Sequence, residues 1–139
     1  MINIDGEMKE LINRALADHI PCILGTATTD GQPEISVKGS VFVYDPETLA
    51  YWERAKRTAL KNINDNPRVV IFYRNRDKRI NIRFYGTATV YETGPVREEV
   101  LKRTVKEELD RDPGLQGIAV LVRIDRIVEL SGKVLQQRD

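Results

Sequence analysis

The chain has 139 residues, 41% of them hydrophobic and 31% charged, with a net charge of +1. Such a composition is ordinary for one globular domain with its own core, and the small net charge gives no global attraction to nucleic acid or to an anionic membrane. A single cysteine and a single histidine exclude an internal disulfide and leave too few soft ligands for a zinc site.

The N-terminal segment predicts an amphipathic helix over residues 7–18, because its apolar side chains recur at helical spacing before Pro21 stops it. The first ten residues lack the apolar core of a secretion signal. No stretch approaches the roughly 20 consecutive apolar residues that span a bilayer. We therefore expect a cytoplasmic protein with no membrane segment, forming one domain over residues 1–139.

Strands are predicted after this helix. Two strands flank a turn at residues 29–32, where Gly31 provides the positive φ that such a turn requires. Gly39 lies inside the second strand, and we interpret it as a bulge or kink where another group approaches the backbone. A third strand covers residues 49–52, and a short helix over residues 58–65 follows it.

A hairpin comes next, with arms at residues 69–73 and 80–91 around a charged tip. The second arm alternates cleanly, as a strand with one buried face does. Its apolar face consists of Ile80, Ile82, Phe84, Gly86, Ala88 and Val90. The opposite face carries Tyr85 and Tyr91, which fit either a dimer interface or an ordinary strand beneath a helix.

The remaining chain predicts a helix over residues 96–109, opened by Pro95, and a long last strand that begins at residue 118. That strand is apolar on both faces at first, as in a barrel strand that is also covered outside. Six strands at hairpin spacing, with helices between them, predict a mostly β protein built on a six-stranded antiparallel barrel with flanking helices.

No side chain has the surroundings of a catalyst. His19 follows the first helix and Cys22 begins an apolar strand, so both are interpreted as structural, and one histidine cannot serve a nucleophile–base pair. The carboxylates after residue 96 are interpreted as a solvated surface; they are Glu98, Glu99, Glu107, Glu108, Asp110 and Asp112. We expect no catalytic residue and no metal site, so any chemistry must come from a cofactor.

Positive charge gathers where the helix over residues 58–65 begins. Lys56, Arg57 and Lys61 surround Thr58, which we expect to cap the helix, although the free N–H groups there already carry partial positive charge. A phosphate bound at this helix start would explain the excess charge. A solvated basic face around an ordinary cap is the alternative. The basic segment at residues 74–83 is interpreted as a solvated hairpin tip rather than a nucleic-acid site.

Three segments, taken in order, resemble the flavin mononucleotide (FMN)-binding split-barrel family related to pyridoxamine 5′-phosphate oxidase. They are "LGTATTDGQPEISVKG", "YWERAKRTALKNINDNPRVVIFY" and "INIRFYGTATVYETGP". The resemblance covers about residues 8–130 and implies a split β-barrel. It also implies a homodimer with FMN at the subunit interface.

The same resemblance implies where FMN lies. The flavin ring would rest on the second strand and the phosphate on the basic helix start, with one contact from the other subunit, counted back from Gly86. The residues implied are Ile35, Ser36, Val37 and Lys38 for the ring strand, Tyr51 and Trp52 for the third strand, Lys56, Arg57, Thr58 and Lys61 for the phosphate, and Asn81 for the contact from the other subunit.

The resemblance implies a flavin-dependent oxidoreductase or electron-transfer protein acting with a small-molecule electron donor or acceptor. The chain has no counterpart of the oxidase's C-terminal segment of substrate contacts, so we expect no pyridoxamine phosphate oxidase activity. A deazaflavin-dependent reductase remains open as an alternative. So does a module that holds flavin, haem or another planar ligand without turnover.

Overall fold

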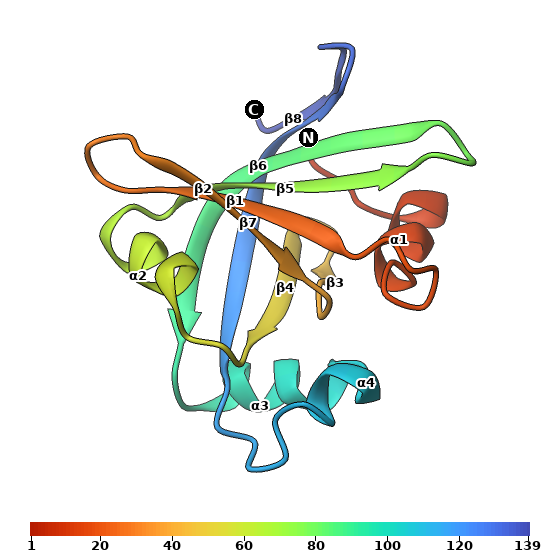
Figure 1. Cartoon of the computed structure of the whole chain (residues 1–139). Helices are drawn as coiled ribbons and strands as arrows, with labels where there is room; N and C mark the ends of the chain where they lie inside the picture. Colours follow the sequence, from red (N-terminus) through yellow and green to blue (C-terminus); the bar gives the residue numbers. More distant parts are fainter.

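An antiparallel sheet of eight strands, curved into an incomplete barrel, organises the computed structural model of residues 1–139 (Figure 1). The strands are β1 (Cys22–Ala27), β2 (Pro33–Lys38), β3 (Phe42–Asp45), β4 (Thr48–Glu53), β5 (Arg68–Asn75), β6 (Ile80–Tyr91), β7 (Ile118–Glu129) and β8 (Val134–Gln137). The helices are α1 (Gly6–Asn13), α2 (Thr58–Asp65), α3 (Pro95–Arg103) and α4 (Lys106–Leu109).

The barrel is split because its two terminal strands do not pair. The order across the sheet is β2-β1-β5-β6-β7-β4-β3, with β8 added to β7. β2 and β3 follow one another along the chain but lie at opposite ends of this order, so residues 39–41 carry the chain across an unpaired gap. The split-barrel fold expected from the sequence is therefore confirmed, with this gap as the split.

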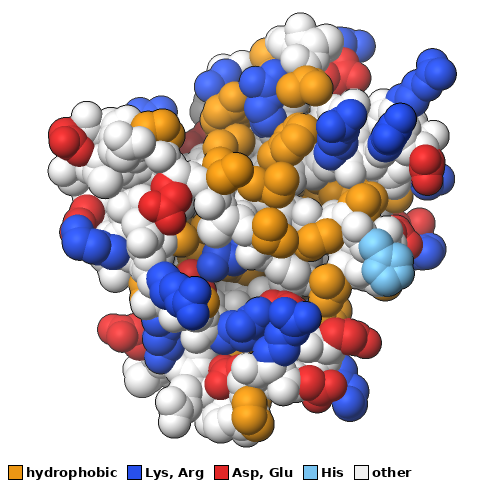
Figure 2. Space-filling model, in the orientation of Figure 1, with side chains coloured by type: hydrophobic (Ala, Val, Ile, Leu, Met, Phe, Trp, Pro, Cys, Tyr) orange, Lys and Arg blue, Asp and Glu red, His pale blue; other side chains and the backbone are white.

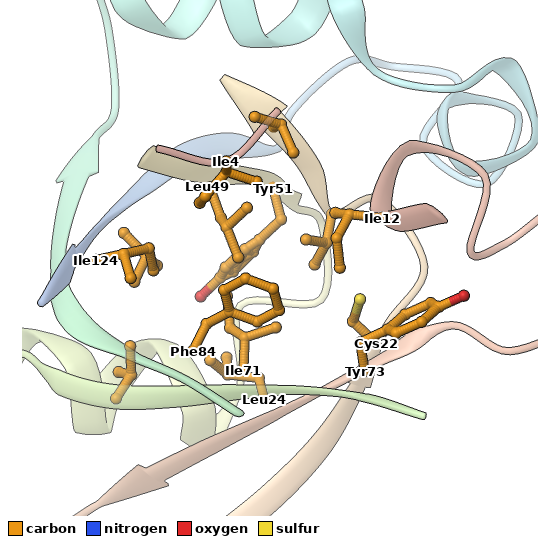
Figure 3. Close-up of a cluster of buried hydrophobic side chains, with 14 of the residues drawn as sticks. Ile4, Ile12, Cys22, Leu24, Leu49, Tyr51, Ile71, Tyr73, Phe84 and Ile124 are labelled. Atoms are coloured by element: carbon orange, nitrogen blue, oxygen red, sulfur yellow. The ribbon is translucent and has the colours of Figure 1, made fainter. Parts of the chain in front are cut away.

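Two hydrophobic clusters lie on the two faces of β4. The larger fills the barrel, where Leu49, Tyr51, Phe84 and Ile124 point toward one another (Figure 3). The smaller lies under α3 and includes Trp52, Val100 and Ala119. Alternation along β4 sends Tyr51 into the first cluster and Trp52 into the second, which explains why every residue of this strand is buried.

The strand count is the main correction to the predicted architecture, since eight strands replace six. The predicted second strand is two strands, β2 and β3, because Gly39–Val41 crosses the split. The closing strand β8 was not predicted, since its residues are mostly exposed and carry no strong apolar pattern. The close approach expected at Gly39 is confirmed, because a Cβ there would lie 3.0 Å from the Glu108 carboxylate.

The predicted helices were too long. α1 ends at Asn13 and a series of turns continues to residue 19, whereas residues 7–18 were expected to be helical. The helix expected over residues 96–109 is divided into α3 and α4, because Thr104 is extended and its hydroxyl bonds to the Val100 carbonyl at 2.6 Å. None of the four helices has the length and apolar character needed to cross a bilayer.

The alternation predicted for β6 is confirmed, with Ile82, Phe84 and Ala88 buried. Gly86 lies on the same face, where β6 and β7 shift register. A Cβ at Gly86 would overlap the carbonyl oxygen of Arg123 and lie 2.9 Å from a methyl group of Val122. Only glycine allows the two strands to approach this closely at the bend of the barrel.

We predict that Gly86→Ala lowers the free energy of unfolding by about 1–3 kcal/mol, because the added methyl group forces the β7 backbone to move. Thr87→Ala, on the exposed face of the same strand, is the matched control and should change stability by less than about 0.5 kcal/mol. Urea denaturation measures both. Equal stability of Gly86→Ala and the original chain would show that the strands separate at no cost.

Candidate functional site

The edge of β2 beside the split offers unpaired polar groups. Because β2 is a terminal strand, part of its backbone N–H and C=O groups has no strand partner. The Ser36 hydroxyl on this strand is buried and also has no hydrogen-bond partner. A buried polar group without a partner is costly, so this edge is suited to a ligand that supplies donors and acceptors in a line.

Alternation along β2 divides the four predicted ring contacts between its two faces. Ser36 and Lys38 pair with the buried residues Leu24 and Cys22 and therefore face the barrel side. Ile35 and Val37 lie on the outer face, 74% and 64% exposed.

An ion pair joins the end of β2 to the end of β4 across the split. Lys38 Nζ lies 3.0 and 3.1 Å from the two carboxylate oxygens of Glu53. The Lys38 side chain is 11% exposed and that of Glu53 is 1% exposed. The ammonium also lies 5.5 Å from the centroid of the Tyr51 ring.

A second contact closes the split nearby. The Ser40 hydroxyl accepts a hydrogen bond from the Trp52 amide at 2.9 Å and donates one to the Trp52 carbonyl at 3.2 Å. Both partners are buried.

Glu53 was missed by the sequence analysis. The predicted strand ended at residue 52, whereas β4 includes Glu53 as its last residue. A carboxylate that ends a strand of otherwise apolar or uncharged residues was the available signal, since such a group is buried only with a partner.

Tyr51 and Trp52 contribute differently to this region. The Tyr51 side chain points into the barrel (Figure 3), and its buried hydroxyl has no partner. Burial, reinforced by the Glu53 carboxylate, raises the pKa of Tyr51. Because Trp52 points away, toward α3, only its backbone lies beside the split.

The Trp52 indole is held from outside the split. It donates a hydrogen bond to Asp112 at 2.9 Å and packs under the Arg97 guanidinium, 4.9 Å from the ring centroid. Asp112 also accepts the backbone N–H groups of Gln116 and Gly117 at 3.1 and 2.8 Å. The predicted solvated acidic surface is therefore incomplete at Asp112, which is partly exposed but accepts three hydrogen bonds. It is wrong at Glu108, which is buried beside Arg54.

The basic residues lie at the start of α2, as predicted, but the cap differs. Arg57, not Thr58, is the N-cap residue, and no side chain bonds to the free amides there. Thr58 is instead the first helical residue and is exposed, so its predicted capping role is wrong. The first backbone bond of the helix runs from the Lys61 N–H to the Arg57 carbonyl, which leaves the three preceding N–H groups free.

The charges at this helix start are not equally available. Lys61 pairs with Asp65 at 2.9 Å one turn along the helix, whereas Lys56 and Arg57 are exposed and form no ion pair. Lys56 adopts a left-handed backbone with φ of 53°, and its N–H points to Glu53 at 3.4 Å. An anion would thus meet free amides and two unpaired cations.

Asn81 lies elsewhere in the chain. It pairs with Arg74 near the tip of the β5–β6 hairpin, on the outer face, and its side-chain oxygen is buried without a partner. The surrounding hollow is lined by hairpin residues alone. Within one chain the structure does not bring Asn81 to the split.

The outer face of the sheet is apolar where Ile35 and Val37 lie, whereas charged residues surround Asn81 on the same face. Figure 2 shows hydrophobic side chains gathered over β1, β2 and β5, with Lys and Arg side chains below them. A cavity of about 400 Å³ opens on this face, and its lining includes Ile35, Val70 and Tyr85. Tyr91, in contrast, packs against the cluster under α3, as the alternative of a strand beneath a helix predicts.

Comparison with known proteins gives one family match. The family model described as pyridoxamine 5′-phosphate oxidase matches residues 5–127. No curated protein matches the chain.

Among solved structures, HupZ of Group A Streptococcus is 28% identical, with a TM-score of 0.77 over 96% of this chain and 99% of that chain. A candidate pyridoxamine 5′-phosphate oxidase of Lactobacillus delbrueckii is 26% identical, with a TM-score of 0.69 over 91% and 98% of the two chains. An FMN-binding protein of Syntrophomonas wolfei, at 16% identity and a TM-score of 0.69 over 89% and 86%, shows the fold alone.

Asp112 yields a pH-dependent prediction. Burial alone would raise its pKa, but the hydrogen bonds from Trp52, Gln116 and Gly117, together with nearby Lys56, lower it below the ordinary value. A carboxyl with a lowered folded-state pKa stabilises the protein above its unfolded pKa of about 4, and this stabilisation is lost as the pH falls through the folded value.

Asp112→Asn should therefore lower the free energy of unfolding at pH 7 by about 1 kcal/mol, a modest value because solvent reaches this carboxylate. Below about pH 4 the difference from the original chain should shrink. Urea denaturation at both pH values tests this, with the exposed Asp110→Asn as control. A difference that stays constant down to pH 3 would contradict the assignment.

Proposed function

The chain belongs to the pyridoxamine 5′-phosphate oxidase family, and on this premise we propose that it is an FMN-dependent oxidoreductase or electron-transfer protein that works as a homodimer. The observation that carries the proposal is the start of α2, where unpaired Lys56 and Arg57 stand beside three free backbone N–H groups. Positive charge at a helix start is unfavourable by itself. A bound phosphate removes the conflict.

The residues present fit FMN. Lys56, Arg57 and the free amides of α2 would hold the phosphate, with Thr58 and Lys61 beside them. The unpartnered Ser36 hydroxyl and the open backbone edge of β2 would bond to the polar edge of the ring. The Tyr51 ring lies beneath the Lys38 ammonium, and the buried Tyr51 hydroxyl also has no partner.

When bound, FMN supplies the transfer of electrons or of a hydride. The chain's own residues then bind and orient the cofactor and exclude water, and none of them acts as an acid or nucleophile. Cys22 supports this division, because burial raises the pKa of its thiol to about 12 and keeps the thiol unreactive.

The outer face supports the dimer. Ile35 and Val37 are more exposed than a monomer would favour, and they continue into the apolar surface of β1 and β5. Asn81 lies on this same face, so a second copy packed here could bring its Asn81 to the split of the first. A site that needs both copies accounts for an Asn81 side chain left unpartnered within one chain.

The first prediction from this function concerns the ligand. Denaturing the purified protein should release FMN, identified by its absorbance and mass, at one per chain. Release of a deazaflavin or of haem would contradict the proposal in favour of the alternatives named above. Bound FMN that a reduced nicotinamide cofactor cannot reduce would favour a binding module over an enzyme.

The phosphate site gives the second prediction. Arg57→Ala should weaken FMN binding by about 1.5–3 kcal/mol, the value of a charge-assisted hydrogen bond. It should leave the ligand-free protein no less stable, because a repulsive charge at the helix start is gone. Riboflavin, which lacks the phosphate, should bind weakly and equally to both proteins. Fluorescence titration measures all of these affinities, with Lys102→Ala on α3 as a control that should bind FMN normally.

The third prediction concerns the proposed dimer. Phe72→Glu places a charge on the outer face beside Ile23 and should convert the dimer into a 15.9 kDa monomer in sedimentation experiments. It should lose FMN affinity as well, although Phe72 is not a predicted flavin contact. Val134→Glu on β8 adds the same charge elsewhere and should leave the dimer intact. A monomeric original chain with full FMN occupancy would exclude the shared site.

A further inference from the structure

We infer that Glu53 is a positioning residue for the flavin. It sets the net charge that β2, the strand proposed to contact the ring, presents to the ring. It also ties β2 to the turn at residues 54–57, which leads into the proposed phosphate site at α2. The inference rests on the proposed function. It assigns a role to a residue that neither the sequence analysis nor the family resemblance singled out.

One carboxylate makes contacts in both halves of the proposed site. Its two oxygens take the Lys38 ammonium at 3.0 and 3.1 Å, at the end of the ring strand β2. One of them also faces the Lys56 N–H at 3.4 Å, at the turn that leads into α2. Because Glu53 itself is 1% exposed and ends a fully buried strand, these contacts are fixed relative to the barrel.

Closing the split does not require an ion pair. The Ser40 hydroxyl already joins the two sides through the Trp52 backbone. Burying two opposite charges costs desolvation, and two apolar side chains of the same size generally stabilise a protein as well or better. An ion pair kept at this point, next to an open strand edge, therefore indicates an electrostatic role in addition to a structural one.

The role follows from the charge of the flavin. Two-electron reduction with uptake of one proton leaves a negative charge on the ring at neutral pH, and charges near the ring tune its potential. With Glu53 present, the ring meets a nearly neutral Lys38–Glu53 pair. Without it, no carboxylate would offset the Lys38 ammonium, which lies at the split over the face of the Tyr51 ring.

The two members of the pair should consequently shift the flavin in opposite directions. Glu53→Gln should strengthen binding of reduced relative to oxidised FMN at least tenfold, which raises the potential by about 30 mV for a two-electron couple. Lys38→Met should shift the ratio tenfold the other way. The double variant should return close to the original value, since it is again neutral.

The matched control is Glu108→Gln. Glu108 is also buried, and it pairs with Arg54, the residue after Glu53, at 3.6 Å. Because it approaches Gly39 from the α4 side, its loss should change the ratio less than threefold. Potentials are measured on FMN-loaded protein by equilibration with a redox dye, and circular dichroism checks each fold.

Each outcome either supports or overturns the inference about Glu53. Opposite shifts that cancel in the double variant support the inference, because damage to the fold would move both single variants the same way. Bound FMN with unchanged potentials in all variants overturns it and leaves the proposed function standing. An original chain that binds no FMN overturns both. If Glu53→Gln fails to fold, Lys38→Met decides, with Lys38→Arg expected to keep the original potential.

Discussion

The barrel of this protein does not close, and an open side joined only by side-chain contacts is the constraint on which the rest of the structure depends. β2 and β3 end the sheet on opposite sides, so no ladder of backbone hydrogen bonds holds them together. The ion pair and the Ser40–Trp52 bonds connect the two sides instead. An edge joined by a few side chains keeps free backbone groups next to a buried interior, which a closed barrel cannot offer.

β4 transmits this constraint to the rest of the molecule. Its alternation commits Tyr51 to the barrel core and Trp52 to the cluster under α3, so the strand cannot rotate or slip without disrupting both. Glu53, next in line, is thereby fixed at the split. The chain then turns through the left-handed Lys56 into α2, which Asn62 anchors to Thr26 of β1 by a hydrogen bond of 3.0 Å.

Charge is distributed unevenly over the two halves of the proposed flavin site. Beside β2 the cation is neutralised within the chain, whereas at the start of α2 two cations have no partner. That difference would suit the proposed ligand, since the phosphate of FMN is a dianion while the oxidised ring is neutral. In the proposed dimer, the apolar outer face is the surface on which a second copy would bring its Asn81 to the ring.

Local pattern in the sequence determined the helix at residues 58–65, the alternation of β6, the buried Cys22 and the basic helix start, because each depends on neighbours a few residues away. Tertiary structure alone decided the division of β2 from β3, the burial of Glu53 against Lys38 and the capture of Trp52 by Asp112. The last two pairs lie 15 and 60 residues apart, so periodicity could not reveal them. A strand's own sequence fixes which side chains share a face, but the partner across a gap is chosen by how the whole sheet curves.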